Sequence, residues 1–408
     1  MKSSQVLIAL LSSQATRAAT SASQHQCAHG QQHVLFDQTP LCHDATPASP
    51  SHASDAFTHP TWSHRPFCIS KAGTQYCTHT TITFRTNHGL SIISTPTAAD
   101  AISSAFPHAA SARHISAAEH LDVRAIPGKG YGLIATQPIA KGATILLDAP
   151  RIIASAQFPA HVLREQGSAL FAHALDRLPT QDQELVKSLD KSLGGTDIED
   201  VMKTNAFACQ VDDGGEDDAY MCLFPNVARI NHACRPNAHA RFIPRTLLME
   251  VKALRDIAAG EEIGISYGRV DLKSSERRKL YQDGWNFSCT CDMCTASEYA
   301  VAGSDQRRAR FAQLRKKLEG LTSETYDAQQ IVAWEKEVMD LSAKEGLDVL
   351  LAADYERLAY VYAGHGMKKD ATFWANKARE SLLEWKSVDG GPSNEVDRIE
   401  ELLRELEA

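Results

Sequence analysis

The chain has 408 residues, which is enough for two or three domains with sizeable hydrophobic cores. Its formal net charge of −8 excludes the basic footprint over the whole chain that marks a dedicated nucleic-acid-binding protein. No apolar run reaches the roughly 18 residues that span a bilayer, so we expect no transmembrane helix.

Residues 1–22 resemble a secretory signal peptide, because Lys2 precedes a short apolar run at 6–11 and small residues follow it. The alternative is a short helix or an irregular start, which Arg17 and the polar residues after the run favour. Four cysteines follow, and their wide, irregular spacing suits two disulfides of an exported protein better than a metal site: Cys27, Cys42, Cys68 and Cys77.

Residues 23–118 form a region rich in Cys and His that contains short strands. Strand-like runs lie at 67–69, 75–77, 80–85 and 90–93, with a turn at 87–89. A short helix is predicted at 98–105 and a linker at 109–119.

The next region, 119–270, begins as a small β-rich unit and contains a helical insert. Short strands separated by turns are predicted at 123–126, 131–135, 144–148 and 151–154. Residues 158–208 change to helical spacing of the leucines, for example Leu163, Leu170 and Leu175.

The segment Arg-Ile-Asn-His-Ala-Cys-Arg-Pro-Asn at 229–237 has neither strand nor helix periodicity, so we interpret it as part of a site. A strand is predicted at 247–254, and Gly-Glu-Glu-Ile-Gly-Ile-Ser-Tyr follows at 260–267. Three cysteines with Cys-x-Cys-x-x-Cys spacing end the region at 289–294. A glycine-rich turn, Pro-Gly-Lys-Gly-Tyr-Gly, lies upstream at 127–132; alone it is a weak signal, and its alternative is a β-turn.

In this order the four motifs resemble the SET-domain family of lysine methyltransferases, in particular fungal members related to the SET-and-MYND group. The resemblance covers about 120–297 and implies an α+β fold, with a β-rich SET domain at 119–270, its helical insert at 158–208 and a post-SET flap at 271–297. In that family the Asn-His and Gly-Glu-Glu…Tyr segments thread past one another in a knot-like core. The cysteine-rich MYND finger is absent, because the insert region holds at most Cys209 and Cys222.

The resemblance implies methyl transfer from S-adenosylmethionine to a protein lysine, a displacement in which positioning supplies much of the catalysis. The lysine must attack as a neutral amine, which a narrow, desolvated channel beside the sulfonium would favour. Tyr267 matches the tyrosine beside the transferring methyl group, so it is the candidate catalytic residue and a cofactor contact. The other implied cofactor-binding residues are Lys129, Gly130, Tyr131, Gly132, Asn231, His232 and Phe287. Phe287 and Trp285 would wall the adenine pocket, although bare aromatics are more often core residues.

A structural zinc site is predicted in the flap. Cys289, Cys291 and Cys294 can direct three thiolates to one centre, and a tetrahedral structural site needs four. The family resemblance supplies Cys234 as the fourth ligand, so zinc would hold the flap over the cofactor.

Residues 298–408 are expected to be all helical, with helices at 307–319, 328–344, 348–363, 369–385 and 395–407. The piece 355–378 loosely resembles a tetratricopeptide helix pair, but one repeat cannot establish a solenoid. This region is a candidate surface for a protein partner.

Two other functions remain open: a catalytically weak SET module that acts as a binding scaffold, and an exported cysteine-rich binding protein built around 23–95. The joint presence of the Gly-x-Gly, Asn-His and Tyr positions favours the enzyme, acting on a histone or another protein. Zinc thiolates suit the reducing nucleus or cytoplasm, whereas a leader and paired early cysteines suit the secretory pathway. Motif specificity makes the zinc site the stronger of these two signals.

Overall fold

The structure is a computed structural model that describes residues 57–71, 73–85, 88–111, 120–215, 219–385 and 394–407. The leader-like segment 1–22, Cys27 and Cys42 lie outside the described residues. The chain divides into two compact units that alternate along the sequence. Among the described residues, unit 1 comprises 57–111, 148–228 and 244–248, and unit 2 comprises 120–147, 229–243 and 249–407, each with the gaps given above.

Unit 1 is built on a six-stranded sheet with the strand order β1-β2-β3-β7-β9-β8. Neighbouring strands are antiparallel except β3 and β7, which are parallel. A disulfide between Cys68 and Cys77 joins β1 to β2 at a pair that is in register. The strands are β1 (Phe67–Lys71), β2 (Thr74–Arg85), β3 (His88–Ser94), β7 (Ile152–Ser155), β8 (Phe207–Cys209) and β9 (Tyr220–Leu223).

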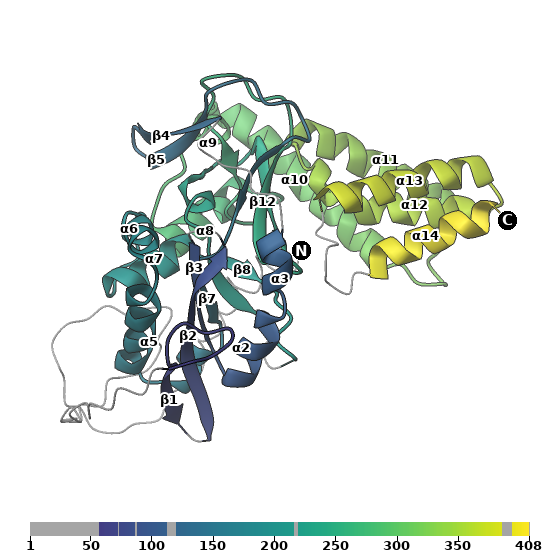
Figure 1. The fold of residues 1–408 in the computed structure, drawn as a ribbon. Helices are drawn as coiled ribbons and strands as arrows, with labels where there is room; N and C mark the ends of the chain where they lie inside the picture. The colour runs from purple at the N-terminus through teal and green to yellow at the C-terminus, as the bar shows by residue number, and fades with distance from the viewer. Residues whose placement is uncertain are drawn as a thin grey trace, which may run out of the picture. The chain divides into compact units, whose positions relative to one another are not determined.

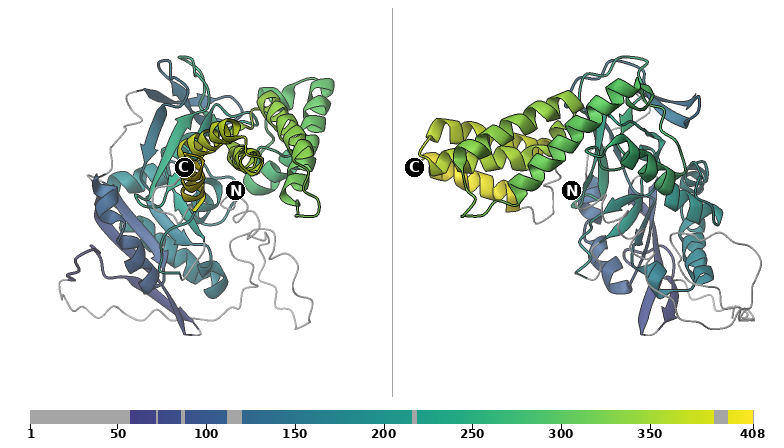
Figure 2. Two further views of the ribbon diagram at one scale, coloured as in Figure 1. Left: turned by 90° about the vertical axis from the view of Figure 1, so that its right-hand side faces the viewer. Right: turned by 180° about the vertical axis from the view of Figure 1, so that it is seen from behind.

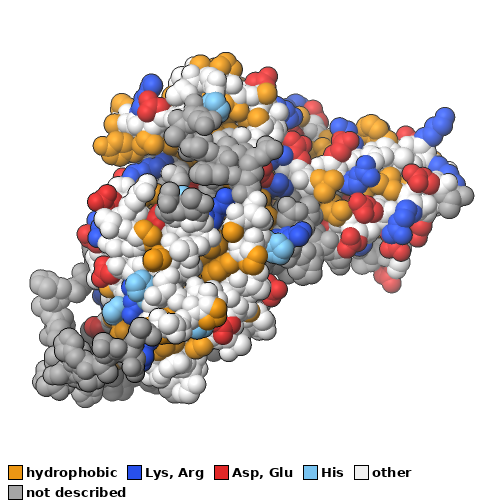
Figure 3. Space-filling model, in the orientation of Figure 1, with side chains coloured by type: hydrophobic (Ala, Val, Ile, Leu, Met, Phe, Trp, Pro, Cys, Tyr) orange, Lys and Arg blue, Asp and Glu red, His pale blue; other side chains and the backbone are white. Residues whose placement is uncertain are grey.

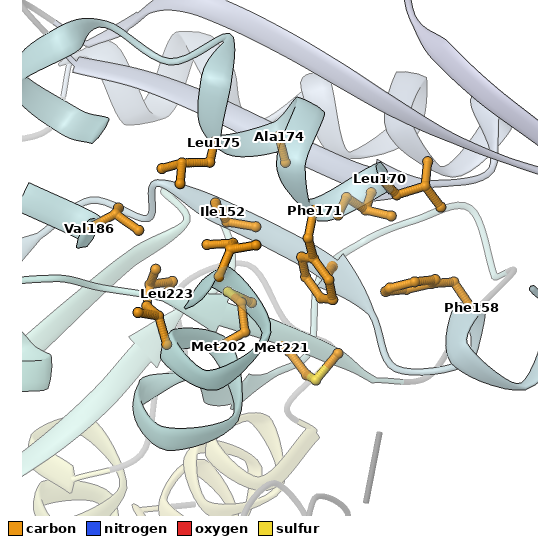
Figure 4. Packing of buried hydrophobic residues seen from close by; sticks show 14 of the residues in the cluster. Ile152, Phe158, Leu170, Phe171, Ala174, Leu175, Val186, Met202, Met221 and Leu223 are labelled. Atoms are coloured by element: carbon orange, nitrogen blue, oxygen red, sulfur yellow. The ribbon is translucent and has the colours of Figure 1, made fainter. Parts of the chain in front are cut away.

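Helices pack on this sheet and complete its hydrophobic core (Figure 1). Phe158, Leu170 and Phe171 from the helices lie over Ile152 and Leu223 from the sheet, all fully buried (Figure 4). The hydroxyls of strand residues Thr78 and Ser91 donate to backbone carbonyls of α5, so even the polar positions of the sheet bind a helix. The helices of unit 1 are α2 (Pro96–Ser103), α3 (Phe106–Ser111), α4 (Phe158–His161), α5 (Arg164–Asp176), α6 (Thr180–Lys187) and α7 (Asp197–Asn205), and a 3₁₀ turn, η3 (Val227–Arg229), spans the unit boundary.

Unit 2 begins with short strands in three small sheets. A hairpin joins β4 (Leu121–Ile126) to β5 (Gly130–Ala135) through the glycine-rich turn. A three-stranded sheet has the order β11 (Ala238–Ile243), β12 (Leu248–Ala253), β6 (Thr144–Asp148). The third sheet is the two-residue parallel pair of β10 (Asn231–His232) and β13 (Gly264–Ile265).

The rest of unit 2 is helical, and from α10 to α14 each helix packs on the next one in the chain (Figure 2). Two hydrophobic clusters hold this array together, one among α10, α11 and α12 and one among α12, α13 and α14. On the face shown in Figure 3, acidic and basic side chains of these helices are interspersed. The helices are α8 (Ser274–Trp285), α9 (Asp292–Thr295), α10 (Glu298–Glu319), α11 (Ala328–Glu345), η4 (Asp348–Leu350), α12 (Ala352–Gly364), α13 (Lys368–Trp385) and α14 (Asn394–Glu407).

The predicted α+β class, with a β-rich centre and helices at the C-terminal end, is confirmed. Three details differ. The strands predicted at 75–77 and 80–85 are one strand, β2, because its pairing with β3 continues across Thr78. The segment predicted as a linker from 109 begins inside helix α3, whose first residue, Phe106, packs edge-on against Trp62 and Phe84. The predicted helical insert ends in strand β8, which pairs with β9.

No helix in the described ranges combines the length and the apolar character that crossing a membrane requires.

Candidate active site and metal centre

The parallel pair β10–β13 brings together the two segments that the sequence marks as a site. Asn231 pairs with Gly264 and His232 with Ile265. Gly264 eases this approach, because a Cβ on it would lie 3.0 Å from the Cβ of Ala233 and would push that residue away by a few tenths of an ångström. Both predicted motifs therefore meet through their backbones.

The side chain of Asn237 links the same two segments by hydrogen bonds. Its Oδ1 accepts from the Gly264 N–H at 2.7 Å, and its Nδ2 donates to the Glu262 carbonyl at 2.8 Å and to Glu261 Oε1 at 2.9 Å. Asn237 is buried, so it works as a fixed cross-link of the site.

A polar network surrounds Asn231. Its Nδ2 donates to Glu262 Oε1 at 2.9 Å, and the other oxygen of Glu262 accepts from Lys129 Nζ at 2.8 Å. Gly132 packs against this network, because a Cβ there would lie 2.7 Å from Asn231 Nδ2. The glycine-rich turn thus contacts the Asn-His segment, and Lys129 forms an ion pair with Glu262.

Tyr267 lies just after β13 among aromatic rings. Its hydroxyl donates to the Ile230 carbonyl at 2.9 Å, which directs the side chain back toward β10. The ring centroid of Trp285 is 5.3 Å away, and those of His232 and Phe287 are 5.5 Å and 6.1 Å away. These rings wall the phenol and give it a partly dehydrated setting.

His232 is buried, with 5% of its surface exposed, and both of its ring nitrogens have protein partners. Nδ1 accepts from the Tyr267 backbone N–H at 3.2 Å, and Nε2 lies 3.3 Å from Cys234 Sγ. Burial lowers the pKa of His232 to about 4, so the ring is neutral near pH 7. What His232 offers to a ligand is therefore its backbone.

The four predicted metal ligands form one cluster. The sulfurs of Cys234, Cys289, Cys291 and Cys294 all lie within 4.8 Å of one another. Cys234 Sγ is 3.9 Å from Cys289 Sγ and 3.4 Å from Cys294 Sγ. A zinc ion with bonds of about 2.3 Å to four tetrahedral sulfurs requires sulfur separations of about 3.8 Å. The cluster therefore fits a tetrahedral thiolate site, and thiolates are the ligands that zinc prefers.

Local structure places these cysteines. Helix α8 ends at Trp285, and its C-cap Asn286, with a left-handed φ of 55°, turns the chain toward Phe287 and Cys289. Cys291 is the N-cap of α9, and its carbonyl accepts from the Cys294 N–H at 2.8 Å. One tight turn thus sets Cys291 and Cys294, Cys289 lies two residues before it, and Cys234 comes from the loop after β10.

Residues 130–268 match the family model of the SET domain. This part of the chain is a SET domain. Similar proteins include histone-lysine N-methyltransferase set5 of Schizosaccharomyces pombe, which is 29% identical over 191 residues covering 46% of this chain and 54% of that protein. Histone-lysine N-methyltransferase SMYD3 of Mus musculus is 28% identical over 165 residues, 39% of this chain and 37% of that protein. N-lysine methyltransferase SMYD2 of Homo sapiens is 27% identical over 150 residues, 34% of each chain. The matched part thus spans about half of these relatives or less.

The remaining predicted residues lie at the edge of the SET-domain site. Gly130 has a positive φ of 74°, which allows the turn into β5. Tyr131 is half exposed, and the Arg229 guanidinium lies 5.7 Å from its ring centroid. Phe287 lies against His232 and stacks on the Tyr281 ring at 5.5 Å.

Sequence reasoning missed several residues of the SET-domain site. Glu262 is not among the predicted site residues, and its bridge from Lys129 to Asn231 has no local sequence signal. Helix α8 was not predicted within the flap, and its buried residues Arg277 and Tyr281 interact electrostatically with the cysteine cluster. Their spacing of four residues on one helix was the available signal.

Proposed function

We propose that the protein is an S-adenosylmethionine-dependent protein-lysine N-methyltransferase with a structural zinc ion. The observation that carries the proposal is the meeting of Asn231, His232 and Tyr267 at the β10–β13 pair of a SET domain. The printed names of similar proteins, which include histone-lysine and N-lysine methyltransferases, support a protein lysine as the acceptor.

The cofactor, when bound, supplies an electrophilic methyl group on a sulfonium. The backbone of 130–132 and of Asn231 and His232 would hold it, because glycine lets a ligand approach the main chain closely. Glu262 fixes the Asn231 amide, so this donor and acceptor pair is oriented before the ligand arrives.

Tyr267 would orient the attacking amine with its hydroxyl oxygen. The hydroxyl is anchored on the Ile230 carbonyl at 2.9 Å, and this bond uses its proton. Its oxygen would accept from the lysine N–H groups and lie against the polarised methyl group. Trp285 and Phe287 keep water away from this oxygen, which favours the neutral amine.

The four clustered cysteines would hold zinc and so fix the flap that carries Phe287 beside Tyr267. The ion has no step in methyl transfer; its contribution is to the folding of the flap. We also propose the C-terminal helices as a surface for a protein partner, because Tyr360 and Phe373 are large apolar residues exposed there.

The first test is calorimetric titration of the purified protein with S-adenosylmethionine, with zinc measured on the same sample. We expect binding with about one zinc per chain. A screen of histones and other proteins with methyl-labelled cofactor should then place the label on lysine, in an amount that Tyr267→Phe reduces. Zinc-loaded, folded protein that binds no cofactor would refute the enzyme and favour the scaffold.

A further inference from the structure

The sulfur of Cys234 is surrounded by polar groups that the proposed reaction does not use. Cys234 is 1% exposed and is the one cluster cysteine that comes from the β10 side. His232 Nε2 lies 3.3 Å from its sulfur, and Arg277 and Tyr281 of α8 are near enough to Cys234 to interact with it electrostatically. The two α8 residues are four positions apart, so they lie on one face of the helix.

The hydrogen bonds of His232 determine where its ring proton sits. The Tyr267 backbone N–H can only donate, so Nδ1 of His232 must be the acceptor, at 3.2 Å. In the neutral ring the proton is then on Nε2, which is the nitrogen that faces Cys234 Sγ at 3.3 Å. His232 is therefore a donor to the sulfur, and it links that sulfur to the backbone of Tyr267.

Arg277 and Tyr281 each bury a donor for which no acceptor is found among the described residues. They are the Nε of Arg277 and the hydroxyl of Tyr281. Arg277 is 1% exposed, and its other nitrogens bind the Leu272 carbonyl and Met293 Sδ, the latter at 3.3 Å. Tyr281 is fully buried, with its ring centroid 4.1 Å from that of His232. A buried donor without an acceptor lowers the free energy of unfolding, so a nearby acceptor for these two groups would stabilise the protein.

Metal binding would provide that acceptor, because it converts the four thiols to thiolates. Four thiolates around one zinc ion carry a net charge of −2, and a buried guanidinium offsets part of it.

We propose that His232, Arg277 and Tyr281 form a donor shell on the Cys234 thiolate, and that through His232 this shell makes the position of Tyr267 depend on bound metal. The inference rests on the proposed zinc site. In the metal-bound protein the shell holds the His232 ring between sulfur and the Tyr267 N–H. When the metal is removed, the thiolate charge disappears and this support for Tyr267 weakens.

The first experiment measures metal affinity in the full chain by competition with a chelator. Tyr281→Phe keeps the ring and removes the hydroxyl, and Arg277→Lys keeps the charge and removes Nε. Each variant should lose zinc affinity by roughly tenfold or more, as outer-shell substitutions at metal sites do. The matched control is Arg278→Lys on the exposed side of the same helix, which should leave zinc affinity unchanged.

The second experiment measures the electronic environment of the metal-bound sulfurs by absorption spectroscopy. Cobalt(II) replaces zinc, and the sulfur-to-cobalt charge-transfer absorption should shift in Tyr281→Phe and not in Arg278→Lys. In ¹⁵N spectra of the wild type, His232 should carry its proton on Nε2, and the Tyr267 amide resonance should move when metal is removed.

Unchanged zinc affinity and cobalt spectra in both folded variants would overturn the donor shell. If the Tyr267 amide resonance does not move when metal is removed, the link between the metal site and Tyr267 is overturned. All of these measurements can be made whether or not the protein transfers methyl groups. A wild-type protein that shows the shell effects and binds no S-adenosylmethionine would therefore refute the proposed function alone.

Discussion

Gly132 offers the sharpest test of how the site is built, through the substitution Gly132→Ala. The residue has no positive φ, so alanine brings no backbone strain, only a methyl group. The added Cβ would lie 2.7 Å from Asn231 Nδ2, 2.9 Å from Ile126 Cγ1 and 3.1 Å from Glu262 Oε1. Ordinary contact begins at 3.4 Å, so Asn231 must retreat by about 0.7 Å.

This movement breaks or weakens the charge-assisted bond between Asn231 and Glu262. Such bonds contribute about 1.5 to 3 kcal/mol, and inserting a methyl group into a packed site costs about 1 to 3 kcal/mol. We expect the free energy of unfolding to fall by about 2 kcal/mol. We also expect the affinity for S-adenosylmethionine to fall about tenfold, equivalent to about 1.4 kcal/mol.

Urea unfolding and calorimetric titration measure the two effects of Gly132→Ala. The control is Gly128→Ala in the same turn, where a Cβ would meet nothing within 4 Å but φ is +74°. It should cost about 1 to 2 kcal/mol of stability through backbone strain and leave cofactor affinity unchanged. The reasoning is refuted if Gly132→Ala binds the cofactor as tightly as the wild type, or if Gly128→Ala loses as much affinity.

Three other outcomes are expected. Tyr267→Phe removes the hydroxyl that is held by the Ile230 carbonyl, so it should lower turnover by about 10² to 10³ and leave cofactor affinity nearly unchanged. Single-turnover rates with labelled cofactor measure the effect on turnover. An unchanged rate would contradict the role assigned to Tyr267. Cys291→Ser should remove bound zinc and weaken cofactor binding, and equal calorimetric affinity in variant and wild type would rule out a zinc-held flap. Burial, and next Asp354, raise the pKa of Glu335 to about 8, above its ordinary value of 4.5. The folded state therefore keeps a proton that the unfolded state has lost, so stability falls as pH rises from about 4.5 to 8, by up to about 1.4 kcal/mol per pH unit. Glu335→Gln should flatten this dependence in urea midpoints taken across that range, and parallel pH profiles for the two proteins would contradict it.

The elements that sequence predicts well are those whose signal is local. Short strands and turns at 121–135 and the C-terminal helices follow from residue periodicity, and the cysteine spacing at 289–294 follows from metal geometry. The Asn-His segment stands out because its polar residues fit no periodic element.

What sequence could not predict depends on contacts between distant residues. The Lys129–Glu262 pair joins residues 133 positions apart, and nothing near either residue selects the other. Arg277 was missed because arginine is almost never fully buried unless it is paired, so composition alone places it on the surface. The continuous β2 was divided into two strands because its pairing with β3 outweighs the local pattern.

The two-residue length of β10 and β13 has a consequence for the order of folding. The pair joins segments about thirty residues apart, and the Cys234–Cys294 contact spans 60 positions, so neither is supported by neighbours in the chain. Contacts of this kind form only after loop closure, whereas the β4–β5 hairpin closes over a few residues. The site should therefore be the last part of its unit to gain protection from hydrogen exchange during refolding. During synthesis, the chain would have to leave the ribosome as far as Cys294 before the site could form.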